Sequence, residues 1–346
     1  MSTLPELTRK IDDAFTETWY EIRPDAADNI QDAIVVWAAM REAGCFTPQV
    51  GGAFITRPIR YGTATTAAVA KGDVFSQGEP ELETMAMWTW RYLSAHVQRS
   101  VFDDQQNNGK FKIKDYVAKR LKAAREALDA TYETDALRAQ VPLEGGKELQ
   151  GLNDLLPVYE SGGAYHATEG TVTYGKINRP TAYADSGNGV LVPSTGNTWW
   201  GSKYLVGTAP IEVNLLSDLK KLVNSVHNNQ EMPNLILTDQ SGFEVYEEYA
   251  MDASQIIKEN GSQLADLGFS VLRFKGIPFT WSPNVESGTF MVLNLNHVEV
   301  IYDPQLWFEM SEWKPSQLGG ERIAHILTAC NIITDQPRRH GALVYA

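Results

Sequence analysis

The most constraining feature of the sequence is a helical pattern that runs without interruption from Gly109 to Arg138. Its apolar residues recur at spacings of three and four and so lie on one stripe of a helix: Ile113, Val117, Leu121, Ala124 and Leu128. At 1.5 Å per residue, about 30 residues make a rod of roughly 45 Å. This length favours a helix that serves as the spine of the molecule, although a surface helix of an ordinary α/β enzyme has the same periodicity.

Composition limits the classes of protein that the chain can belong to. The 346 residues are 43% hydrophobic and 21% charged, which predicts a globular protein with two domains or one elaborated domain. The formal net charge of −13 disfavours tight binding of nucleic acid. The longest apolar runs, such as residues 33–40, are shorter than the roughly 18 residues of a membrane span, so we expect a soluble, cytosolic product that does not bind membranes.

The sequence contains little that predicts enzyme chemistry. It has no phosphate-binding loop, no nucleophile elbow and no zinc-protease motif, so we predict no catalytic residue, no cofactor and no metal site. Cys45 and Cys330 lack metal or disulfide spacing and are expected to be buried thiols. His297 and His325 are expected to be core histidines, and His227 to end a helix. A soluble α/β hydrolase or transferase remains an alternative class, weakened by the missing nucleophile or metal ligands.

The first 52 residues read as two short helices on an arm. One helix places Phe15 and Trp19 on the same face, and a second, after Pro24, contains Ile34 and Trp37. The segment is too thin to bury two indole rings by itself. We therefore expect Trp19 and Trp37 to lie on the body of the same chain or on a neighbouring molecule.

Residues 54–97 have the composition of a long extended hairpin. Two segments, 54–61 and 83–97, are rich in β-branched and aromatic residues, and the small Thr/Ala-rich stretch 62–80 connects them. The returning segment carries large apolar residues on both faces: Met85, Met87, Trp88 and Trp90. Because an isolated two-stranded ribbon is marginal in water, such a ribbon needs cover from elsewhere. Two strands inside an ordinary sheet would give the same pattern.

The second half alternates between irregular and α/β patterns. Residues 139–209 are punctuated by glycines and predict either a long loop system or, as we favour, a small β insertion. A helix is predicted from near Asn214, a buried strand at 235–237, and a helix that begins with a capping box formed by Ser241 and Glu244. Further strands are predicted at 269–274, 277–281, 289–295, 298–302, 306–313 and 321–333.

In this order the elements resemble the major capsid proteins of tailed bacteriophages, which have the Hong Kong 97 (HK97-like) fold. The resemblance covers about residues 50–138 and 205–335. The segments that carry it are the hairpin segments 54–61 and 83–98, the junction 99–104 into the spine, the strand-to-helix step 234–244, Gly276-Ile277-Pro278, and the later segments 289–294 and 300–303. Several elements that agree in order are stronger evidence than one short motif.

The resemblance implies an α+β, HK97-like capsid fold with six regions. These are an N-terminal arm (1–52), an extended β-hairpin loop or E-loop (53–100), a peripheral domain with the spine helix (101–140), a Gly-rich insertion (141–209), an α/β axial domain (210–305) and returning strands of the peripheral domain (306–346). Only about 50 residues precede the hairpin, whereas the founding member of the family has a long scaffolding region there. We therefore expect any scaffolding protein to be a separate chain.

The resemblance also implies a structural function and a set of partners. Copies of the chain would form hexamers and pentamers and close into an icosahedral phage head that encloses double-stranded DNA, with a portal, a scaffolding protein and a decoration protein as partners. The packaged DNA would be contacted weakly and without sequence specificity. An encapsulin-like shell around a cargo enzyme is the alternative within the same fold.

A set of residues is predicted to contact neighbouring subunits because they are large and apolar, lie in the projecting segments or form the basic cluster near the C-terminus. These residues are Trp19, Trp37, Lys71, Met85, Trp88, Trp90, Arg338 and Arg339. Lys71 and Asn331 also provide the residue types of an isopeptide crosslink found between subunits of some relatives. Asparagines are common, so this pairing alone is weak support for a crosslink.

Overall fold

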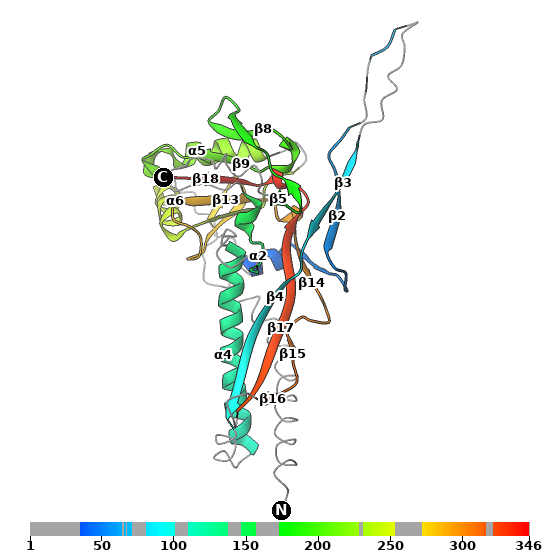
Figure 1. Cartoon of the computed structure of the whole chain (residues 1–346). Helices are drawn as coiled ribbons and strands as arrows, with labels where there is room; N and C mark the ends of the chain where they lie inside the picture. Colours follow the sequence, from blue (N-terminus) through cyan, green and yellow to red (C-terminus); the bar gives the residue numbers. More distant parts are fainter. Residues whose placement is uncertain are drawn as a thin grey trace, which may run out of the picture.

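The computed structural model describes most of the chain after the arm. The described residues are 35–63, 66, 68–70, 81–100, 110–137, 147–156, 173–227, 231–252, 272–315 and 321–345. The first arm helix, the hairpin tip around Lys71 and the Asp103-Asp104 junction lie outside them. Figure 1 shows an elongated peripheral part, a compact axial part at one end and a hairpin that projects away from both.

The predicted spine is present as helix α4 (Lys110–Leu137), which is 28 residues long. It runs beside the long strand β4 (Arg91–Ser100), as Figure 1 shows. Leu121 and Leu128 of the predicted stripe are buried, whereas the Lys122 side chain, off the stripe, is 75% exposed. The part of the stripe from Leu121 to Leu128 therefore faces the core as expected.

The peripheral sheet is built around the 14-residue strand β17 (Glu321–Thr334). Strand β4 pairs with it antiparallel over ten positions, from Glu321↔Ser100 to Cys330↔Arg91. Strands β14 (Val298–Tyr302), β15 (Glu309–Met310) and β16 (Lys314–Pro315) pair with successive segments of β17, and β1 (Phe46–Pro48) lies parallel to β14. Helix α2 (Val35–Glu42) and the short η2 (Leu152–Leu155) complete this part.

The axial part contains an eight-stranded mixed sheet in the order β11-β12-β10-β13-β18-β9-β8-β7. Its strands are β7 (Ala182–Asp185), β8 (Val190–Thr195), β9 (Lys203–Val206), β10 (Leu235–Thr238), β11 (Leu272–Phe274), β12 (Ile277–Trp281), β13 (Thr289–Leu293) and β18 (Gly341–Val344). Helices α5 (Ile211–Val226) and α6 (Gln240–Asp252) pack against it. Two short helices, η4 (Thr198–Trp200) and η5 (Leu295–His297), lie in its connections.

The central strands of the axial sheet are buried on both faces. Ile236 and Val292 belong to the cluster under α5 and α6, whereas Leu235, Leu237 and Met291 belong to the core shared with the spine helix and the peripheral sheet. Alternate residues of a strand point to opposite faces, so β10 and β13 read as continuous apolar runs rather than alternating ones. The two parts of the chain are thus joined through one hydrophobic core.

The hairpin is a two-stranded ribbon of β2 (Ile55–Arg60) and β3 (Glu83–Trp88), paired antiparallel from Ile55↔Trp88 to Arg60↔Glu83. A small hairpin of β5 (Thr173–Tyr174) and β6 (Ile177–Asn178) supports its base, because Gly175 accepts a hydrogen bond from the backbone of Met87 at 2.9 Å. The predicted single strand 83–97 is in fact two strands. Strand β3 stays in the ribbon while β4 joins β17.

The strand pairing differs from two of the expected regions. Strands β7, β8 and β9, which lie in the predicted Gly-rich insertion at 141–209, are hydrogen-bonded into the axial sheet. Strand β18, expected among the returning strands of the peripheral domain, lies between β13 and β9 of the axial sheet. Edge strands and crossings between sheets depend on pairing between distant segments, which local periodicity does not report.

The start of α6 also differs from the predicted capping box. Asp239, and not Ser241, accepts the backbone N–H of Gly242 at 3.1 Å, and its second oxygen accepts the hydroxyl of Ser241 at 2.5 Å. These hydrogen bonds favour the ionised carboxylate and outweigh its partial burial, so the pKa of Asp239 is lowered. An aspartate cap satisfies an N–H at the helix start as a serine would.

The Leu128→Ala variant tests the orientation of the spine helix. Leu128 is 4% exposed and packs in the shared core, so its truncation is expected to lower the free energy of unfolding by about 2–5 kcal/mol. The control Lys122→Ala removes an exposed side chain and is expected to change it by less than about 0.5 kcal/mol. Chemical denaturation of the unassembled subunit measures both. Equal effects would contradict the assigned face.

Candidate functional site

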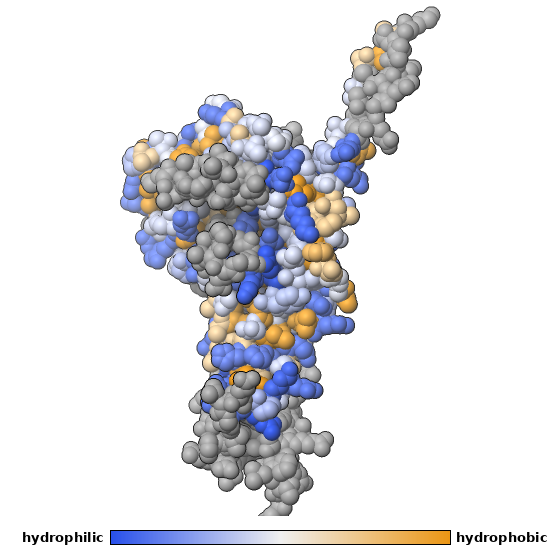
Figure 2. Space-filling model, in the orientation of Figure 1, coloured by the Kyte–Doolittle hydropathy of each residue, from blue (hydrophilic) through white to orange (hydrophobic). Residues whose placement is uncertain are grey.

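The ribbon differs strongly between its two faces. Ile55, Ile59, Ala86 and Trp88 are buried against the same chain, and Trp88 meets Tyr174 edge-on at 5.7 Å between ring centroids. On the opposite face Met85 is 49% exposed. The chain therefore covers one face at the base of the ribbon and leaves Met85 exposed on the other. Figure 2 shows hydrophobic residues on the surface near the place where the projecting segment leaves the body.

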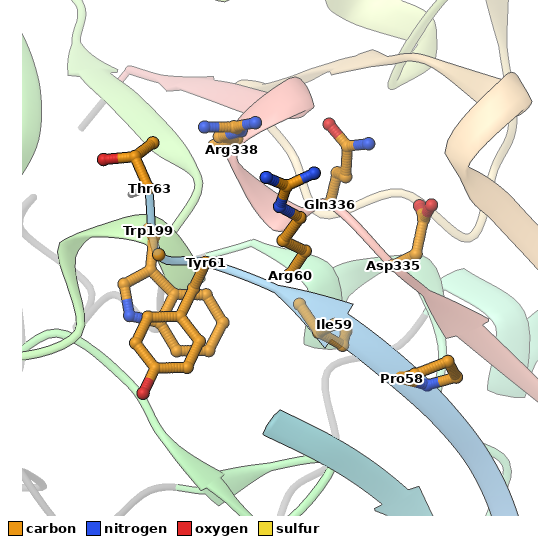
Figure 3. Close-up of a pocket in the computed structure, with 10 residues that line it drawn as sticks. Pro58, Ile59, Arg60, Tyr61, Thr63, Trp199, Asp335, Gln336 and Arg338 are labelled. Carbon is orange, nitrogen blue, oxygen red and sulfur yellow. The ribbon is translucent and has the colours of Figure 1, made fainter. Parts of the chain in front are cut away.

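A hollow of about 360 Å³ lies where the ribbon leaves the body (Figure 3). Its lining comes from three segments that are far apart in the sequence: the end of β2, the short helix η4, and the turn between β17 and η6 (Pro337–Arg339). Tyr61 stacks on Trp199 with centroids 4.8 Å apart and planes at 16°, and its hydroxyl donates to Glu81 at 2.9 Å. This stack forms one wall of the hollow.

The side chains that line the hollow carry a net positive charge. Arg60 and Arg338 are exposed, and no ion pair within the described part of the chain involves either guanidinium. In Figure 3 these two side chains lie near each other, whereas Asp335 lies apart from them. The carboxylate of Asp335 is engaged by the ring of His297 at 3.0 Å. The pKa of Lys203 is lowered first by burial and then by the charges of Arg339 and Arg338.

Beside the hollow, a histidine bridges two carboxylates at the junction of the two sheets. His297 Nε2 lies 2.7 Å from Glu231 and Nδ1 lies 3.0 Å from Asp335. The hydrogen bond to Asp335, followed by the bond to Glu231 and both negative charges, raises the pKa of His297 despite its partial burial. His297 lies before β14 and Asp335 follows β17, so the bridge connects two places where the chain passes between the sheets.

A second histidine at this junction is held neutral. His340 is completely buried, its Nδ1 accepts the backbone N–H of Asn294 at 3.3 Å, and its Nε2 lies 3.1 Å from the hydroxyl of Thr334. Burial, with the charge of His297 as a smaller cause, lowers the pKa of His340 to about 3. The hydroxyl of Thr334 also donates to the carbonyl of His297 at 2.6 Å, so both crossings belong to one hydrogen-bonded network.

The aromatic residues predicted to contact neighbours have different environments. Trp37 is 3% exposed and packs edge-on against Tyr132, and Trp88 is 2% exposed. Their own chain covers both indoles, and contact of either with a neighbouring subunit stays a prediction. Trp90 is half-buried and donates to the carbonyl of Gly52 at 2.8 Å, and Met85 remains available on the outer face. Trp19 and Lys71 lie outside the described residues.

The two arginines of the basic cluster near the C-terminus differ in exposure. Arg338 is exposed at the hollow, whereas Arg339 is 9% exposed and donates to Gln336 at 3.2 Å. Asn331 is completely buried and hydrogen-bonds Thr89 and Gln150, so it is not accessible to a lysine from a neighbour. The crosslink hypothesis is therefore wrong for Asn331.

The isolated histidines and cysteines complete the comparison with the sequence. Cys45 and Cys330 are buried, and burial raises the pKa of each thiol to about 12. His227 follows α5 as predicted, but His325, expected in the core, is exposed on β17.

Among the described residues no cluster of three or more metal-binding side chains occurs. Within the same residues, no helix is both long and apolar enough to cross a bilayer.

The wall of the hollow was not predicted from the sequence. Tyr61 follows the last residue of β2, and Trp199 lies in a Gly-rich region without periodicity, so no local pattern relates them. The paired tryptophans Trp199-Trp200 were the available signal, since two adjacent indoles are unusual in a loop and indicate packing against another element.

Comparisons with known proteins identify the fold. No protein family and no curated protein sequence matches the chain. Among solved structures, the cyanophage A-1(L) capsid matches with a TM-score of 0.58 and 12% identity over 86% of this chain and 89% of that chain. The capsid of an empty GTA particle matches with a TM-score of 0.51 and 11% identity over 88% and 89%. A chain of Microbacterium phage Oxtober96 matches with a TM-score of 0.50 and 10% identity over 88% and 90%.

These matches extend over most of the chain. The α+β, HK97-like fold of phage capsid proteins is therefore confirmed. At these identities the likeness concerns the fold.

The His297→Gln variant tests the bridge between the two sheets. Because the folded-state pKa of His297 is raised above 6.5, its stabilisation is complete below pH 6.5 and is lost as pH rises through the folded-state pKa. At pH 6 the variant is expected to lose about 1–3 kcal/mol of unfolding free energy, and the loss should shrink at higher pH. Denaturation of the subunit at several pH values measures this.

His325→Gln is the matched control, because His325 is exposed on β17 and makes no hydrogen bond to the bridge. We expect it to leave the pH dependence unchanged. A constant loss for His297→Gln from pH 5 to pH 9 would contradict the charged bridge.

Proposed function

We propose that the chain is a structural, non-enzymatic major capsid protein that self-assembles as hexamers and pentamers into an icosahedral phage head around double-stranded DNA. The observation that carries the proposal is the ribbon of β2 and β3, which projects from the body with Met85 of β3 at 49% exposure and Leu82, just before β3, at 37%. A two-stranded ribbon is marginal alone, and a neighbouring copy in a closed shell supplies the missing surface.

The fold and the charge agree with this proposal. The chain shares its fold with the capsids of a cyanophage and of a GTA particle. A net charge of −13 suits a container that must not hold its DNA fast. The proposed partners are further copies of the chain, a scaffolding protein, a portal and a decoration protein, with weak and sequence-independent contact to DNA. The protein would occupy the host cytoplasm during assembly and the capsid of the virion afterwards.

Electron microscopy of the purified protein, together with its elution volume on a sizing column, tests the proposal. Closed hollow particles, or hexamers and pentamers, are the expected result. Recovery of nucleic acid from particles made in infected cells is expected as well. Particles that instead contain one packed enzyme would favour an encapsulin-like shell, and a monomer at all concentrations, with and without the phage's scaffolding protein, would contradict the assignment.

Deletion of residues 63–78 at the ribbon tip separates folding from assembly. Ile55, Ile59, Ala86 and Trp88 anchor the ribbon base and are kept, so the variant is expected to unfold at nearly the same temperature as the intact chain. It is expected to form no closed shells, because the ribbon no longer reaches a neighbour. Electron microscopy and thermal unfolding measure the two properties. Intact shells from this variant would contradict the role given to the ribbon.

Shell assembly is also expected to depend on salt. Subunits with a net charge of −13 repel one another, and ions screen such repulsion over about 10 Å at 0.1 M. The yield of particles should therefore rise as salt increases from about 10 mM to 200 mM. Light scattering at fixed protein concentration measures the yield, and a flat response would show that charge does not limit assembly.

A further inference from the structure

We propose that the hollow at the base of the ribbon is a carboxylate-binding pocket that receives an aspartate or glutamate side chain from a second copy of this chain. The inference deepens the proposed function and rests on it, because the second copy is the neighbouring subunit. The pocket is defined by Arg60, Tyr61, Trp199 and Arg338.

The cations of the pocket come from two separate elements. Arg60 ends β2 and Arg338 lies in η6, so the pairing of the ribbon and the crossing from β17 to β18 bring them to the same hollow. Neither has an ion-pair partner in the described ranges, whereas Arg57, on the same strand as Arg60, is paired with Glu299 at 2.6 Å. Two unpaired guanidiniums that share a concave site favour an anion there.

The shape of the pocket favours a planar carboxylate. The stack of Tyr61 on Trp199 replaces water along one wall, which lowers the local dielectric and strengthens an ion pair relative to one on a flat surface. A guanidinium presents two parallel N–H groups that match the two oxygens of a carboxylate. The nearby Asp335 does not fill this role, because its carboxylate is held by His297.

The charge of the chain and the surroundings of the pocket point to a second copy as the donor. Acidic residues number 43 against 30 lysines and arginines, so the cationic hollow is complementary to the rest of the protein's own surface. Exposed apolar residues of the ribbon lie next to the pocket: the carbonyl of Leu82, which is 37% exposed, accepts the backbone N–H groups of Tyr61 and Gly62, and Met85 on the returning strand is 49% exposed. A subunit that covers Leu82 and Met85 would reach the pocket.

Charge reversal tests the pocket in the full-length chain. The double variant Arg60→Glu/Arg338→Glu is expected to raise the subunit concentration needed for assembly by at least about tenfold, because like charges then meet at the contact. Lys220→Glu, an exposed reversal on α5 outside the hollow, is expected to change it less than about twofold. Both should melt within about 2 °C of the wild-type subunit, since none of the three side chains is buried.

A zero-length crosslink identifies the occupant. A lysine in place of Arg338 keeps the charge and can form an amide with a bound carboxylate when a carbodiimide is added. Isotope-labelled and unlabelled Arg338→Lys subunits are mixed, assembled and crosslinked, and the joined peptides are analysed by mass spectrometry. The expected product joins the peptide containing position 338 of one isotopic form to an acidic peptide of the other form.

The outcomes separate this inference from the proposed function. If wild-type shells form normally, two results would overturn the proposed carboxylate pocket and leave the capsid assignment intact. One is normal assembly of the double variant, and the other is crosslinks that occur only within single chains. Variant shells that close but hold less DNA would overturn it in favour of a phosphate ligand. A wild-type chain that never assembles would overturn the proposed function, and the pocket with it.

Discussion

The pairing of β17 with its neighbours is the interaction on which the rest of the structure depends. This strand of 14 residues bonds to β4 over ten positions and also to β14, β15 and β16. Its second half is nearly all buried, and Tyr132 of the spine helix donates to Thr328 within it at 2.5 Å. A ladder of this length beside a helix of 28 residues fixes an elongated body.

This arrangement leaves the ribbon dependent on surface outside the chain. The β4 segment continues from the ribbon strand β3 and is committed to β17, so β2 has β3 as its one strand partner among the described residues. Intrachain packing covers Ile55, Ile59 and Trp88, and Met85 stays exposed on the outer face. The same geometry creates the hollow, since the ribbon leaves the body next to η4 and η6. Projection, exposed apolar surface and a cationic hollow are thus consequences of one sheet topology.

The junction between the two sheets explains how an elongated body and a compact axial part behave as one unit. The chain crosses between the sheets after β13 and again after β17, and the crossings share the hydrogen bonds of His297, Thr334 and His340. The two carboxylates raise the pKa of His297, whereas burial lowers the pKa of His340, so the two values move in opposite directions. A polar junction that is fully bonded in this way specifies one relative placement of the two sheets.

Local pattern predicted the elements well and their partners poorly. The spine helix, β12 and β14 begin and end within one residue of the expected positions, and α5 begins three residues before Asn214, because periodicity and flanking turn residues are local signals. The placement of β7–β9 and β18 in the axial sheet, and the exposure of His325, depend on pairing between segments far apart in the sequence. The hollow was not predicted for the same reason: Arg60, Trp199 and Arg338 come from three separate segments.

Amide hydrogen exchange of the ribbon tests most directly whether a neighbouring copy completes the structure. Exchange is compared between the unassembled subunit and the assembled particle, with the β4–β17 ladder as an internal reference, since its pairing is intrachain. The account predicts that backbone amides of β2 and β3 exchange much more slowly in the particle, while those of the reference ladder change little. Equal exchange of the ribbon in both states would contradict the claim that it is completed by a neighbour.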